Sequence, residues 1–381
     1  MLLRVFAVCT LVPLLGASSC RESSTPEGMY AGPHIAWQIP INKGYADASW
    51  HGVPAVADGR FYFAETSNIT AVDVASGSRI WTTTIRNNPA ALTSKLVVHG
   101  HRIFHADFPD VWALEATSGQ ILWRYASDSD ASVAESAVDD HAVYVGTRDH
   151  KVLALDLNDG HPIWTADVGA GWTQPGIVQG LSVSGDTVYA GVTRWFVSNG
   201  YLQAAVIVAL DRSTGRELWR YQSDGDRHGI VATPVVAGRN LIADDVIFGS
   251  VFAVDRFTGK EVWRIDAAPG GYGPQDSPII VGDTAFIASN DTYFYALDSK
   301  SGMRYWASQG RGGSFTGGVV CGRYAMGNAQ GVDVFDRGTG RKVSSMLVAV
   351  GPERAFPTSH FATSGSRAFV TGILWAWAID C

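Results

Sequence analysis

The chain has 381 residues, of which 46% are hydrophobic and 17% are charged, so it is long enough to bury an extensive core. Its formal net charge is −7 at pH 7 and it has no run of lysine and arginine, which excludes the basic footprint of a nucleic-acid-binding protein. The 42 glycines and 13 tryptophans, in a chain without sustained helical periodicity, favour an all-β fold of short strands and tight turns.

The first 20 residues are typical of a secretory signal. Arg4 precedes an apolar run too short to span a bilayer, and small residues lead to Cys20. This end is similar to the lipobox of bacterial lipoproteins, in which the cysteine is lipidated; ordinary signal cleavage is the alternative. The resemblance implies a polar tether over residues 21–33. It also implies the periplasmic face of the outer membrane, because Arg21 stands where inner-membrane retention is associated with aspartate. We expect the lipid anchor to be the only membrane attachment.

After the tether, one pattern recurs seven times without gaps. In each copy an acidic residue precedes a glycine by four positions, and in six of seven a tryptophan follows four positions later. The acid can accept hydrogen bonds from backbone amides two or three residues on, and the glycine supplies a positive φ, so each copy predicts a tight turn between strands. The copies are AVDVASGSRIW (71–81), ALEATSGQILW (113–123), ALDLNDGHPIW (154–164), ALDRSTGRELW (209–219), AVDRFTGKEVW (253–263), ALDSKSGMRYW (296–306) and VFDRGTGRKVS (334–344).

The spacing of the repeats predicts the number of strands. Successive tryptophans from Trp81 to Trp306 are 42, 41, 55, 44 and 43 residues apart, which is room for four short strands in a blade. The chain ends with the first positions of an eighth copy, Ala378 to Asp380, while Trp37 stands 44 residues before Trp81. We therefore predict an eight-bladed β-propeller of four-stranded antiparallel blades over residues 34–381. The N-terminal strand closes the last blade and removes an exposed sheet edge.

These repeats resemble the tryptophan-docking repeats of PQQ-like eight-bladed propellers. That family includes pyrroloquinoline quinone (PQQ) dehydrogenases and BamB-like outer-membrane assembly lipoproteins, and the resemblance covers residues 34–381. It implies that each tryptophan packs on the glycine turn of a neighbouring blade and holds the ring together. Ser344 departs from the pattern, so we expect a weaker contact between blades seven and eight, and Glu115 replaces the usual aspartate in blade two. The predicted docking residues are Trp37, Trp81, Trp123, Trp164, Trp219, Trp263 and Trp306.

The resemblance favours a monomeric, non-catalytic scaffold that binds envelope proteins, including a subunit of the outer-membrane barrel assembly machinery. We expect no catalytic residues, metal or cofactor under this interpretation. One alternative is a PQQ-dependent quinoprotein dehydrogenase, with the quinone and calcium in the central funnel. The chain lacks the adjacent cysteines and long insertions that many such enzymes carry. Another alternative is a sensor propeller that binds a small ligand or carbohydrate.

Two groups of residues are candidates for binding. The spacing of 55 residues from Trp164 to Trp219 indicates an insertion in a hairpin of blade four. Its aromatic and arginine residues are typical anchors of protein contacts, unless they fold against their own blade. The insertion carries Arg194, Trp195, Phe196 and Tyr201. The loops between blades bring His51, Trp172, Arg227, His228, Asp276 and His360 to the predicted rim of the funnel.

Histidines and cysteines give weaker signals. His101 and His105 are four positions apart, which on one strand is about 13 Å, too far for one ion with ligands at about 2 Å. We interpret these two and His99 as surface histidines. Cys321 and Cys381 could form a disulfide in an oxidising compartment, but their spacing does not decide whether they pair.

Overall fold

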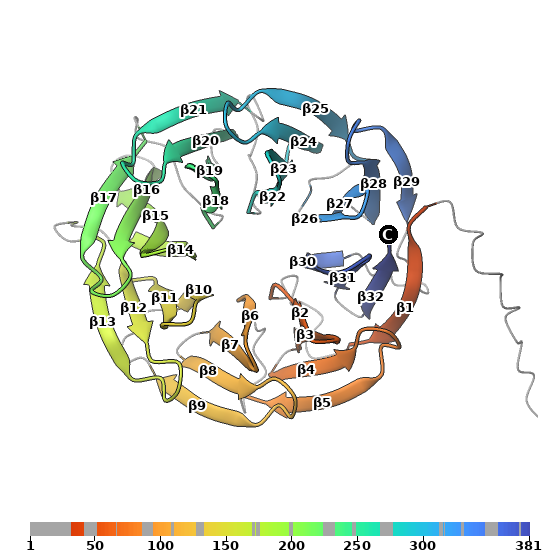
Figure 1. Cartoon of the computed structure of the whole chain (residues 1–381), viewed down its shortest axis with the longest axis horizontal. Helices are drawn as coiled ribbons and strands as arrows, with labels where there is room; N and C mark the ends of the chain where they lie inside the picture. The colour runs from red at the N-terminus through yellow and green to blue at the C-terminus, as the bar shows by residue number, and fades with distance from the viewer. Residues whose placement is uncertain are drawn as a thin grey trace, which may run out of the picture. The chain divides into compact units, whose positions relative to one another are not determined.

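The strands of the computed structural model form eight four-stranded antiparallel sheets (Figure 1). The structure describes residues 32–41, 52–65, 67–85, 94–107, 110–126, 133–169, 172, 176–197, 201–223, 233–245, 249–266, 277–311, 315, 317–328, 331–346, 357–372 and 375–381. All of these residues belong to one compact unit, residues 32–381. Every element assigned within them is a strand, so the all-β prediction is confirmed.

The blades follow one another along the chain. Blade 1 consists of β2 (Ala55–Ala57), β3 (Arg60–Glu65), β4 (Asn68–Asp73) and β5 (Arg79–Thr84). Blade 2 consists of β6 (Leu96–His99), β7 (Arg102–Asp107), β8 (Asp110–Glu115) and β9 (Ile121–Ala126). Blade 3 consists of β10 (Val133–Val138), β11 (Val143–Thr147), β12 (Lys151–Leu155) and β13 (Pro162–Asp167). Blade 4 consists of β14 (Gly176–Ser184), β15 (Thr187–Val197), β16 (Tyr201–Asp211) and β17 (Glu217–Gln222).

The second half repeats this order. Blade 5 consists of β18 (Val235–Ala237), β19 (Asn240–Asp245), β20 (Ser250–Asp255) and β21 (Glu261–Asp266). Blade 6 consists of β22 (Ile279–Val281), β23 (Thr284–Ala288), β24 (Tyr293–Asp298) and β25 (Arg304–Gln309). Blade 7 consists of β26 (Gly318–Cys321), β27 (Tyr324–Asn328), β28 (Val332–Asp336) and β29 (Lys342–Met346). Blade 8 consists of β30 (Pro357–Ser364), β31 (Arg367–Gly372), β32 (Trp375–Asp380) and β1 (His34–Pro40).

The sheets close into a ring. The first strand of each blade lies nearest the axis and contacts the first strand of the next blade, and β30 of blade 8 contacts β2 of blade 1 (Figure 1). In blade 8 the outermost strand is β1, which pairs antiparallel with β32 so that Trp37 lies opposite Ala378. The predicted eight blades and the closure by the N-terminal strand are therefore confirmed.

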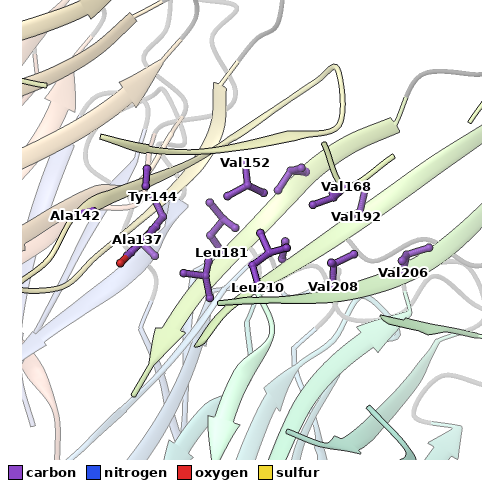
Figure 2. Packing of buried hydrophobic residues seen from close by; sticks show 14 residues of the cluster. Ala137, Ala142, Tyr144, Val152, Val168, Leu181, Val192, Val206, Val208 and Leu210 are labelled. Carbon is purple, nitrogen blue, oxygen red and sulfur yellow. The ribbon is translucent and has the colours of Figure 1, made fainter. Parts of the chain in front are cut away.

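The hydrophobic core lies between neighbouring blades. In the cluster of Figure 2, Tyr144 and Val152 of blade 3 pack with Val192, Val208 and Leu210 of blade 4. The middle strands are buried along most of their length because each blade is covered on both faces, whereas the outer strands alternate between exposed and partly buried residues. The eight sheets are thus held by side-chain packing across their faces.

Blade 4 departs from the others in strand length. Strands β15 and β16 have 11 residues each and stay paired as far as Val197 and Tyr201. The 12 or so additional residues therefore lengthen a regular hairpin, which accounts for the wide spacing from Trp164 to Trp219. Among the described residues, no helix is long and apolar enough to cross a membrane.

Candidate functional site

Each repeat forms a tight turn between the two outer strands of a blade. In blade 4, Oδ1 of Asp211 accepts hydrogen bonds from the backbone amides of Ser213 and Thr214, at 3.1 and 2.9 Å. The amide of Gly215 donates to the Asp211 carbonyl at 2.8 Å. The hydroxyls of Ser213 and Thr214, followed by their amides, lower the pKa of Asp211 below its usual value. Local hydrogen bonds thus fix the turn before it meets the next blade.

The tryptophans dock on these turns. Nε1 of Trp219 in blade 4 donates to the carbonyl of Arg256 in the blade 5 turn at 3.0 Å. A Cβ atom added to Gly259 would lie 2.5 Å from Cε3 of Trp219, so the indole packs directly on the glycine. All seven predicted tryptophans make this bond, at 2.9 to 3.2 Å: Trp37 to Val74, Trp81 to Ala116, Trp123 to Leu157, Trp164 to Arg212, Trp219 to Arg256, Trp263 to Ser299 and Trp306 to Arg337.

The seam between blades 7 and 8 is built differently. Ser344 lies opposite Val334, the position at which the other blades pair a tryptophan with alanine. The start of β1 and the end of β32 stand where the other blades have their turn. A disulfide joins Cys321 at the end of β26 to Cys381, with a Cα–Cα distance of 5.9 Å. A covalent link therefore spans the seam that lacks a docked indole.

Arg367 ties the opposite side of blade 8 to blade 1. Its Nε lies 2.5 Å from Oδ1 of Asp380, and its Nη1 donates to the Val74 carbonyl at 2.6 Å. The same carbonyl accepts the Trp37 indole bond at 2.9 Å. The shared blade is thus fastened on both flanks, by a disulfide towards blade 7 and by an indole and a guanidinium towards blade 1.

The three histidines of blade 2 have separate partners. Nε2 of His99 lies 2.8 Å from Oδ1 of Asp140 in blade 3. Nε2 of His101 lies 4.0 Å from Oε2 of Glu115. His105 is not a surface histidine, contrary to the sequence interpretation: it is fully buried, with Nδ1 3.3 Å from the Ser94 hydroxyl. At this position the side chain of β7 points into the core. Its place in the strand therefore decides its burial, although an imidazole is polar.

A group of possible metal ligands escaped the sequence analysis. Asp156, Asp159 and His161 in the blade 3 turn place one ligand atom each within 4.8 Å of one another. Nδ1 of His161 lies 2.5 Å from Oδ1 of Asp159, and this contact raises the pKa of the imidazole. The unusual residue is Asp159, which replaces the serine or threonine of the other turns. One imidazole nitrogen and one carboxylate oxygen of the group contact each other, and the group lies on an outer hairpin of its blade, away from the axis.

The candidate partner loop lies on the long hairpin of blade 4. Arg194, Trp195 and Phe196 are in β15, and Tyr201 begins β16. In the backbone register, Trp195 stands opposite Gln203 and Phe196 opposite Leu202. The insertion is therefore presented by paired strands.

The structure describes two of the six candidate rim residues. Trp172 lies in the connection from blade 3 to blade 4, with its ring centroid 6.1 Å from that of His150 and 5.9 Å from Cζ of Arg220. It packs against the hydrophobic cluster shared by these blades. His360 lies on β30, the innermost strand of blade 8. The other predicted residues, His51, Arg227, His228 and Asp276, and the candidate lipidation site Cys20, lie outside the described residues.

The closed ring and its docked turns define the class of protein: a PQQ-like eight-bladed propeller with tryptophan docking. The profile of the family described as outer membrane protein assembly factor BamB matches residues 65–200 and 203–326. The match covers more than half of the sequence, so the chain belongs to this family.

Individual relatives point to two kinds of protein. The chain is 23% identical over 297 residues to BamB of Shewanella oneidensis, covering 72% of this chain and 71% of that protein. It is 26% identical over 209 residues to the quinohemoprotein alcohol dehydrogenase ADH-IIG of Pseudomonas putida, covering 50% of this chain but 28% of the dehydrogenase. The crystal structure of BamB from Moraxella catarrhalis matches with a TM-score of 0.69 at 17% identity, over 92% of this chain and 98% of that one. The structural likeness shows the fold alone.

Proposed function

We propose that the chain is a non-catalytic scaffold of the bacterial envelope that binds protein partners during the assembly of outer-membrane β-barrel proteins, as a BamB-like factor. The observation that supports this role most is the share of each relative's length that the sequence alignment covers. The alignment extends along 71% of the Shewanella BamB, but along only 28% of the dehydrogenase. The sequence that aligns with the enzyme is thus a minor portion of its length, although the propeller fold matches 76% of the solved chain of that enzyme.

The disulfide supports an envelope location. Stable disulfides form in oxidising compartments such as the bacterial periplasm, and Cys321 and Cys381 are joined. We place the propeller on the periplasmic face of the outer membrane, anchored by a lipid on Cys20. Under this proposal the ring is a rigid body, and the long hairpin of blade 4 is its docking element.

The dehydrogenase alternative requires residues that could hold PQQ and calcium near the axis. Calcium prefers six to eight oxygen ligands, and many of these enzymes carry adjacent cysteines over the quinone. Here Cys321 and Cys381 are joined to each other between blades 7 and 8. The metal-ligand group of the described residues lies on the outer turn of blade 3. These residues do not fit the quinone site, and we derive no redox step from them.

Affinity isolation from native membranes tests the proposal. The tagged full chain should retrieve subunits of the outer-membrane barrel assembly machinery, and the isolated material should show no dye-linked alcohol oxidation after addition of PQQ and calcium. Retrieval of no assembly subunit, or quinone-dependent activity, would contradict the scaffold role.

A pair of double variants tests the docking hairpin. Exchanging Trp195 and Phe196 for serine should reduce retrieval of the partner. The matched control exchanges Ile121 and Leu122 for serine. They are two adjacent apolar residues of β9, 37% and 39% exposed. The control should retain the partner. Equal retrieval by both variants, with unchanged folding, would remove the hairpin from the binding surface.

A further inference from the structure

Phe257 is an exposed aromatic residue in the turn between β20 and β21 of blade 5, with 58% of its surface accessible. Its backbone amide donates to Oδ1 of Asp255 at 3.0 Å, as the corresponding amides do in other turns. The turn uses this amide and has no need of an aromatic side chain. The equivalent residues of the other turns are Ala75, Thr117, Asn158, Ser213, Lys300 and Gly338.

Two guanidinium groups hold the ring. Cζ of Arg256 lies 4.7 Å and Cζ of Arg239 lies 5.4 Å from the centroid of Phe257, within the range of cation–π attraction. Nη1 of Arg256 donates to the Ser184 hydroxyl in blade 4 at 3.0 Å, and Nε of Arg239 lies 2.5 Å from Oδ2 of Asp255. Because both cations are themselves fixed, the ring is pre-organised, which reduces the entropy lost on binding.

The surroundings of the ring are positively charged. Lys260 is exposed on the same turn. Arg239, Arg256 and Lys260 are three cations beside the one carboxylate of the 255–260 turn, Asp255, whose Oδ1 accepts two amides of its own turn. We call Arg239, Arg256, Phe257 and Lys260 the blade 5 patch. On a chain with a net charge of −7, this patch attracts anionic groups locally.

Acidic residues on both sides limit the shape of the partner. The blade 4 hairpin that bonds Arg256 also carries Asp186, whose side chain is 91% exposed and whose Oδ1 lies 3.1 Å from Nη2 of Arg212. On the other side, Nδ2 of Asn240 donates to the Ser299 carbonyl at 2.8 Å, and the Ser299 amide donates to the carbonyl of Asp283. The side chain of Asp283 is 67% exposed, and its Oδ2 lies 2.6 Å from Nζ of Lys300. A flat anionic membrane would meet these carboxylate ion pairs as well as the patch, whereas a short acidic segment of a protein needs to contact the patch alone.

We propose that the blade 5 patch binds an acidic segment of a partner protein, in which carboxylates flank an aromatic or aliphatic side chain. The apolar side chain packs on Phe257, and the carboxylates pair with Arg239 and Lys260. Exposed aromatic and arginine residues are the typical anchors of protein interfaces. This inference rests on the proposed role as a protein-binding scaffold and adds a second surface, on the turns of the outer strands.

Fluorescence anisotropy tests the patch with the full chain and a defined probe. The probe is a labelled ten-residue peptide of alternating glutamate and phenylalanine, and its control replaces each glutamate by glutamine. Phe257→Ser and the double variant R239S/K260S should each weaken binding of the acidic peptide about tenfold. The matched controls are Met303→Ser, which removes an apolar residue that is 60% exposed in the blade 6 turn, and Arg341→Ser, at the position of Lys260 in blade 7. Both controls should bind like the parent.

The outcomes separate the patch from the general role. Unchanged binding in Phe257→Ser, equal binding of the glutamine peptide, or binding only to vesicles that contain phosphatidylglycerol would overturn the patch. If the acidic peptide does not bind but affinity isolation still retrieves assembly subunits, only the proposal for the blade 5 patch is wrong. If isolation retrieves none while the peptide binds, the patch stands and the assembly role falls.

Discussion

Gly259 and Gly238 of blade 5 allow the docking contact to be separated from backbone strain. Both have positive φ, +69° and +61°, so alanine at either position costs about 1–2 kcal/mol. No atom lies within 4 Å of a Cβ added to Gly238. At Gly259 the new Cβ would lie 2.5 Å from the Trp219 ring, which must withdraw by about 1 Å to reach ordinary contact.

The extra cost at Gly259 has two sources. Overpacking costs about 1–3 kcal/mol, and weakening of the Trp219 bond to the Arg256 carbonyl costs about 1 kcal/mol. We therefore expect Gly238→Ala to lower the free energy of unfolding by about 1–2 kcal/mol and Gly259→Ala by about 3–6 kcal/mol. Equilibrium urea unfolding, followed by tryptophan fluorescence, measures both. Equal losses in the two variants would refute the claim that the indole is wedged against the glycine.

Three further predictions concern the seam, the turns and the anchor. Cys381→Ser should lower the free energy of unfolding by up to about 4 kcal/mol, because the disulfide closes a loop over 60 residues. An unfolding midpoint equal to that of the parent would contradict a stabilising role of this disulfide. The Tyr305 and Ser301 hydroxyls lower the pKa of Asp298 to about 2, below its unfolded value, so its contribution is complete above about pH 4 and is lost as the pH falls towards 2. The melting temperature should therefore fall in this window, less steeply in Asp298→Asn; identical slopes would refute this assignment. Cys20→Ser should release the protein from the membrane fraction, and retention there would exclude a lipid as the only anchor.

The ring could be predicted because its determinants are local. Acid, glycine and tryptophan stand at fixed spacings within each turn, and the match of Trp37 to Ala378 follows from completing the eighth copy. The turn hydrogen bonds of Asp211 and the positive φ of Gly259 are consequences of the same short segments.

The remaining features depend on where distant segments meet. Cys321 and Cys381 are adjacent only because the C-terminal strand lies beside blade 7 after closure, which no local spacing reveals. The burial of His105 depends on the blade that covers β7. Arg256 directly precedes Phe257 in the sequence, whereas Arg239 comes from the hairpin between β18 and β19 and meets the ring only in the folded blade. A sign was nevertheless present, because Phe257 differs from its counterparts in the other six repeats.

Binding between purified proteins tests the scaffold role most directly. Isothermal titration calorimetry of the chain with the purified central subunit of an outer-membrane barrel assembly machine from the same cell should give a saturable one-to-one complex. Exchange of Trp195 and Phe196 for serine should weaken that complex, while the Ile121 and Leu122 control leaves it unchanged. No heat of binding with the intact chain, in a preparation that unfolds cooperatively, would contradict the assignment as a BamB-like assembly factor.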